Sequence, residues 1–175
     1  METYQPELWH DLYVMLGTSS AALVGLIFVA ASLHLQDIVG NDVLFTRTRN
    51  ITLHLIITLM QAAAILTPQP TTALGIELLL INLCGLWPPV IFTYRVYLRD
   101  KRKGARGGFS IYRAMNYVGG YLIGVAGGAL FIWHPNLGMY LVTLAYVNFL
   151  VGAIWNNWKI MFDVGQIDRR KERTR

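Results

Sequence analysis

The chain has 175 residues, of which 54% are hydrophobic and only 14% are charged, with a net charge of +5. Soluble domains carry about 25% charged residues, so this composition excludes an ordinary soluble enzyme and a disordered tail. A single cysteine, Cys84, excludes an internal disulfide, and no Cys or His spacing resembles a zinc or haem site. The sequence therefore predicts an all-α polytopic membrane protein, one transmembrane domain over residues 1–175, with no cofactor and no metal.

Five stretches are apolar and long enough to cross a bilayer, which takes about 20 mostly apolar residues. In chain order they cover residues 12–35, 51–67, 71–98, 111–133 and 139–162. Because proline has no backbone N–H, we expect the third helix to kink or break at Pro88 and Pro89. Residues 36–50 predict either a short helix on the membrane surface or an extension of the second span.

The 15 Lys and Arg residues fall into three clusters, and two predicted spans separate each cluster from the next. The clusters are Arg47 and Arg49; Arg95, Arg99, Lys101, Arg102, Lys103, Arg106 and Arg113; and Lys159, Arg169, Arg170, Lys171, Arg173 and Arg175. Five spans therefore place all three clusters on one side of the membrane. The positive-inside rule makes that side cytoplasmic, with the N-terminus outside and the C-terminus cytoplasmic.

Two basic segments follow from this topology, a cytoplasmic loop over residues 99–110 and a cytoplasmic tail over residues 163–175. Such clusters attract the anionic headgroups of membrane lipids. Neither a nucleic-acid-binding motif nor interleaved aromatic residues accompany the charges, so nucleic acid is not a predicted partner. Aromatic residues at the predicted span ends, such as Tyr13, Trp133 and Tyr140, indicate anchoring at the membrane interfaces.

Small residues recur at four-residue spacing on two of the predicted spans. They are Gly120, Gly124 and Gly128 on the fourth span, and Gly17, Ala21 and Gly25 on the first. Lipid gives no hydrophobic drive for one apolar helix to bind another, so close contact relies on small residues. These faces predict helix packing within one chain or between chains, and we expect a homo-oligomer.

Polar residues also line one face of the second span. A tight turn about Gln69 would place residues at equal depth where their numbers sum to about 138, which brings Gln61 level with Glu77. The candidate intramembrane site comprises Glu77, Gln61, Thr58, His54, Ser19 and Ser20, with His54 near the cytoplasmic end. A buried carboxylate favours a functional site, whereas interhelical hydrogen bonds that merely satisfy Glu77 favour a structural role.

The run from Ser20 to Leu35, SAALVGLIFVAASLHL, and the segment LGIELL over residues 74–79 also carry a family resemblance. They resemble the first helix and a later acidic helix of a group of small bacterial inner-membrane proteins of unknown function. Some members of that group are labelled modulators of the FtsH protease. The resemblance covers the first half of the chain and implies a multi-pass protein of the bacterial inner membrane, with no assigned chemistry.

Two functions remain. The first is a non-enzymatic, self-associating membrane protein that regulates or scaffolds a membrane protein partner, since the helices are lined with glycine and the sequence contains no catalytic motif. The alternative is a small homo-oligomeric ion channel or proton-coupled transporter that uses Glu77 as its intramembrane carboxylate.

Overall fold

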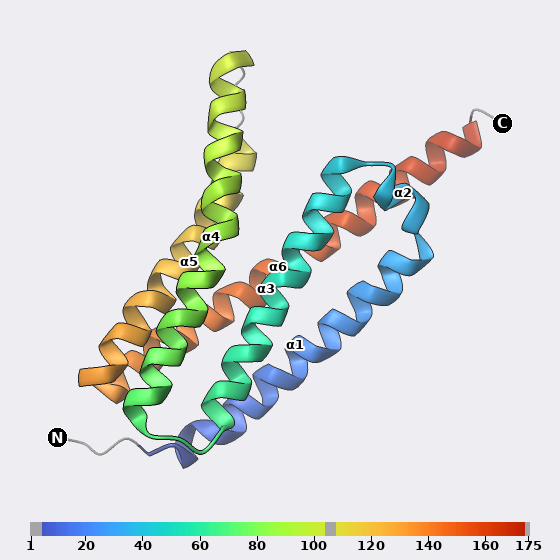
Figure 1. The fold of residues 1–175 in the computed structure, drawn as a ribbon. Coiled ribbons are helices and arrows are strands. Elements are labelled where there is room, and N and C mark those ends of the chain that lie inside the picture. The colour runs from blue at the N-terminus through green and yellow to red at the C-terminus, as the bar shows by residue number, and fades with distance from the viewer. Residues whose placement is uncertain (1–4, 104–107, 174–175) are drawn as a thin grey trace.

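The computed structural model describes residues 5–103 and 108–173, and this part of the chain is helical throughout apart from short turns (Figure 1). The helices are α1 (Glu7–Leu33), α2 (Leu35–Val39), α3 (Asp42–Leu66), α4 (Thr71–Lys103), α5 (Gly108–Trp133) and α6 (Pro135–Arg173). All but the short α2 contain a segment long and apolar enough to cross a membrane. The predicted all-α fold with five spans is thus confirmed.

Proline residues set several of the helix boundaries. Helix α3 ends at Leu66, just before Pro68, and α4 begins directly after Pro70. Pro135 occupies the first position of α6, where its missing N–H would have had no partner within the helix. Between the first two spans both expectations hold in part, because α2 is a short separate helix and α3 begins as early as Asp42.

Helix α4 is continuous from Thr71 to Lys103 and passes through Pro88 and Pro89, so the break expected there is not present. Membrane helices tolerate proline because neighbouring groups satisfy the carbonyls that it frees. Of the predicted basic loop over 99–110, α4 and α5 take up all but residues 104–107, which lie outside the described residues. Helix α6 likewise continues through the predicted tail as far as Arg173.

The helices form two pairs that α6 joins. Helix α4 packs along α5, and α1 packs along α3, whereas α6 contacts both α5 and α3 (Figure 1). The contact between α3 and α4 is less extensive than either pairing. We call the end where α3 begins and where α4 and α6 end the basic end, because the described residues of all three Lys and Arg clusters fall there. Towards the basic end the two pairs diverge (Figure 1).

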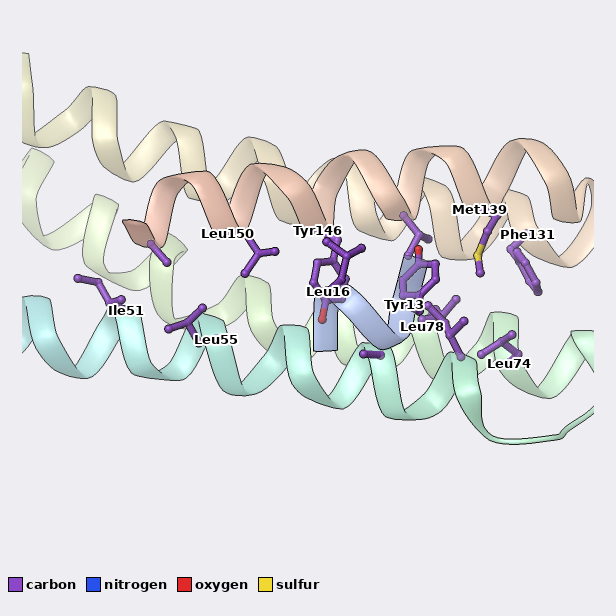
Figure 2. Packing of buried hydrophobic residues seen from close by; sticks show 14 of the residues in the cluster. Tyr13, Leu16, Ile51, Leu55, Leu74, Leu78, Phe131, Met139, Tyr146 and Leu150 are labelled. Atoms are coloured by element: carbon purple, nitrogen blue, oxygen red, sulfur yellow. The ribbon is translucent and has the colours of Figure 1, made fainter. Parts of the chain in front are cut away.

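The main hydrophobic core lies where α3 faces α6, with α1 and α4 completing it. Figure 2 shows Ile51 and Leu55 of α3 opposite Leu150 of α6, and Tyr13 of α1 in the same layer. A second cluster between α5 and α6 contains Tyr117, Tyr121, Ala145 and Phe149. Both clusters surround polar side chains, and these define the candidate site.

Candidate functional site

The glycines of α5 allow its neighbours to approach closely. A Cβ atom on Gly124 would overlap the Asn82 side chain of α4, and one on Gly128 would lie 2.7 Å from the backbone nitrogen of Leu79. A Cβ atom on Gly120 would lie 2.7 Å from Cε1 of Phe149 in α6. These three glycines therefore serve contacts inside one chain, with α4 on one side and α6 on the other.

The small residues of α1 divide between two faces. Gly17 meets α3, since a Cβ atom there would lie 3.0 Å from Cβ of Ala62. Ala21 is exposed, and a Cβ atom on Gly25 would have no heavy atom of the described residues within 4 Å. Residues spaced by four drift around a helix by about 40° per step, because one turn takes about 3.6 residues. Of Gly17, Ala21 and Gly25, only Gly17 therefore contacts α3.

Helices α1 and α3 are joined by two fully buried hydroxyl groups. The Ser20 and Thr58 hydroxyl oxygens lie 3.0 Å apart, and Thr58 donates its own proton to the Leu55 carbonyl at 2.8 Å. Ser20 is consequently the donor to Thr58, and the Tyr146 hydroxyl of α6 lies beside both. Ser19, by contrast, is exposed and donates to the carbonyl of Met15, so it lies outside the site.

Gln61 pairs with Asn82 rather than with Glu77. Its side-chain nitrogen donates to Oδ1 of Asn82 at 2.9 Å, and the Asn82 nitrogen donates to the Leu78 carbonyl at 2.8 Å. Both amides have 0% exposure. Asn82 was not among the residues predicted from the sequence, although a polar side chain in the middle of an apolar span was the available signal.

The expectation of a buried carboxylate at Glu77 is wrong. Glu77 is exposed, and its carboxylate accepts a hydrogen bond of 2.8 Å from Gln69 in the turn between α3 and α4. The buried face of α4 carries Leu74, Leu78 and Asn82, and Glu77 lies beside this row, not on it. Helical side chains point towards the N-terminus of their helix, which brings the carboxylate to the turn.

The prediction that residues of α3 and α4 lie at equal depth where their numbers sum to about 138 is also wrong for Gln61. Gln61 contacts Asn82, which lies five positions further along α4 than the predicted partner Glu77. The separation of α3 from α4 towards the basic end is visible in Figure 1. Matching residues by the sum of their numbers assumes two antiparallel helices that stay side by side, and α3 and α4 diverge instead.

His54 lies on α3 about 7.5 Å along the helix from Arg49 of the first basic cluster, at about 1.5 Å per residue. Its ring contacts Tyr117, which follows the first residue of the α5 span, Asn116, so His54 lies towards the basic end of the bundle. Its side chain is 5% exposed. Nδ1 hydrogen-bonds the carbonyl of Asn50, and Nε2 is buried with no hydrogen-bond partner among the described residues.

Aromatic rings of α5 and α6 surround this imidazole. The ring centroid of His54 lies 4.0 Å from that of Tyr117, 5.5 Å from that of Tyr121 and 5.9 Å from that of Phe149. The Tyr121 hydroxyl is buried and, like Nε2, makes no hydrogen bond within the described part of the chain.

Further polar contacts extend the site towards both ends of the bundle. Towards the basic end, Asn156 donates to the Tyr117 hydroxyl at 2.6 Å. Towards the other end, Tyr13 donates to Thr143 at 2.8 Å, because Thr143 gives its proton to the Met139 carbonyl. We call this set the polar array, and it comprises Asn156, Tyr117, His54, Tyr121, Asn82, Gln61, Thr58, Ser20, Tyr146, Thr143 and Tyr13.

The chemistry of the polar array is that of hydroxyl, amide and imidazole groups. It joins helices by hydrogen bonds, and His54 is its one member whose side chain ordinarily titrates near neutral pH. No group of three His, Cys, Asp or Glu suited to a metal ion occurs among residues 5–103 and 108–173. Searches against family models, curated proteins and solved structures give no match to the chain.

Proposed function

We propose that the chain is a non-enzymatic integral membrane protein that self-associates through the free face of α1 and regulates or scaffolds a membrane protein partner. The observation that carries this proposal is the space around Gly25, where α1 has small side chains and no neighbour from the described residues. Such a face lets a second helix approach closely, which is how membrane helices associate. Of the five spans, α1 also has the smallest buried share, 22% of its most apolar window.

Replacing Gly25 with leucine is expected to convert the oligomer into a monomer of 19.7 kDa without changing its thermal unfolding, because no contact within the chain is disturbed. The measurement is native mass spectrometry of the wild type and the variant in mild detergent. Gly119→Leu is the matched control, since a Cβ atom on Gly119 likewise has no heavy atom of the described residues within 4 Å, but Gly119 lies on another helix, α5. A monomeric wild type, or an unchanged mass for Gly25→Leu, would contradict self-association through α1.

The proposed setting is the bacterial inner membrane, with the N-terminus outside and the basic end in the cytoplasm against anionic lipid headgroups. The three Lys and Arg clusters support this orientation, because their described residues all fall at one end of the bundle.

Reporter fusions test this orientation. Fusions at residue 104 and at the C-terminus are expected to report cytoplasm, and a fusion at residue 136 the outside. The expectation follows from five spans with one basic end. Unlike signals from residue 104 and the C-terminus would show that the two sites lie on opposite sides, which five spans do not allow.

A channel or transporter that uses Glu77 is not proposed. Its basis was a carboxylate inside the bundle next to Gln61, whereas Glu77 is exposed and bound by Gln69. The hydrogen bond from Gln69, which also donates to the Ala64 carbonyl at 3.0 Å, supports a role in holding the turn between α3 and α4.

A further inference from the structure

We propose that His54 is a proton-binding site in the interior of the bundle, towards its basic end, and that the Tyr121 hydroxyl binds Nε2 of His54 through one water molecule. This assignment goes beyond self-association and does not depend on it. The proton comes from the aqueous phase at the basic end and converts the neutral imidazole into imidazolium.

The first argument is the tautomer of His54. A carbonyl oxygen can only accept, so the hydrogen bond to Asn50 requires that Nδ1 carry a proton. In the neutral ring Nε2 is then a bare acceptor, buried without a donor from the described residues. A buried polar atom of this kind is costly and calls for a partner such as water or a proton.

The second argument is that Tyr121 can serve both protonation states. Its hydroxyl is also buried without a partner in the described part of the chain, and its ring lies 5.5 Å from that of His54. A hydroxyl group and a water molecule each donate and accept. The bridge can therefore donate to Nε2 of the neutral ring and accept from Nε2–H of the imidazolium, so protonation reverses the hydrogen bonds without moving a helix.

The third argument concerns the charges around the ring. From α5 it faces Tyr117 and Tyr121, from α6 it faces Phe149, and on α3 itself it is bonded to the Asn50 carbonyl. No carboxylate is among these described contacts of the ring, and three aromatic rings lie within about 6 Å of it, where they can stabilise a cation when it forms.

The fourth argument is access from the basic end. The Tyr117 ring packs against that of His54 at an interplanar angle of 51°, and its hydroxyl accepts from Asn156. Asn156 lies near the end of its span, about 31 Å along α6 from Pro135 at about 1.5 Å per residue. An amide and a hydroxyl therefore occupy the interior between His54 and the membrane boundary.

The test uses the full chain in lipid nanodiscs with His10, His34 and His134 replaced by glutamine. His54 is then the one histidine left, and these three positions lie at helix ends away from the core. With ¹⁵N-labelled histidine, the ring signals are expected to change from the Nδ1–H tautomer to imidazolium between about pH 8 and about pH 4. Ring signals that keep the neutral pattern down to about pH 4 would overturn the assignment.

A second variant tests whether the Tyr121 hydroxyl is the partner of Nε2 in His54. Tyr121→Phe in the same background is expected to move the titration midpoint by about half a pH unit or more, since Nε2 loses its hydroxyl partner. Tyr140→Phe is the matched control, because Tyr140 is exposed on α6 and packs on Trp9 instead. An unmoved midpoint in Tyr121→Phe would remove Tyr121 from the site.

Discussion

Replacing Gly128 with leucine is expected to unfold the pairing of α4 with α5 and to cost about 3 kcal/mol or more. A Cβ atom at this position would lie 2.7 Å from the backbone nitrogen and 3.0 Å from Cα of Leu79. Backbone atoms cannot swing aside as the end of a side chain can, so the two helices must separate. The measurement is thermal unfolding in detergent, followed by circular dichroism or by resistance to a denaturing detergent.

Gly119→Leu supplies the matched control for this variant. It makes the same change on the same helix, but a Cβ atom on Gly119 has no heavy atom of the described residues within 4 Å. We expect its unfolding temperature to stay close to that of the wild type. Equal destabilisation by the two variants would mean that leucine is harmful anywhere on α5, and the contact with Leu79 would then not be the cause.

Replacing Asn82 with alanine is expected to lower the free energy of unfolding by about 1–2 kcal/mol. The change removes the acceptor for Gln61, which is fully buried, and empties the space above Gly124. Equilibrium unfolding in mixed detergent measures the difference. A double-mutant cycle with Gln61→Leu isolates the energy of the hydrogen bond, because the two side chains contact one another directly.

Glu77→Gln is compared with Asn82→Ala, because Glu77 is the carboxylate that the sequence predicted in the site. Its side chain is exposed and bonded to Gln69, and glutamine retains an acceptor oxygen for that bond. We expect its stability to equal that of the wild type within about 0.5 kcal/mol. A larger loss of unfolding free energy for Glu77→Gln than for Asn82→Ala would show that Glu77 belongs to the polar array after all.

Hydropathy and proline placement were enough to predict the spans. The end of α3 and the start of α4 follow from Pro68 and Pro70, whose effect on the backbone is local, whereas α6 begins at Pro135, four residues before the predicted start at 139. The start of α3 was placed too late, because polar residues before Ile51 hid the apolar face that Leu44 begins.

The polar array was less accessible to sequence reasoning. Ser20 and Thr58 were included and do meet, since a hydroxyl in an apolar helix turns towards another helix. Glu77 was favoured over Asn82 because a charge is the stronger signal in a sequence, yet the uncharged amide is the group that the bundle can bury. Tyr13 was interpreted as an interface anchor, but its 0% exposure and its bond to Thr143 place it in the core.

The position of α6 has a consequence for biosynthesis. The ribosome delivers α1 and α3 first and the hairpin of α4 and α5 next, and these two units share little contact. The last helix of the described chain packs on both, so the interior stays open to lipid and to membrane proteases until α6 is inserted. Termination before Pro135 would leave two partly exposed hairpins that quality control can recognise, because only the insertion of α6 closes the bundle.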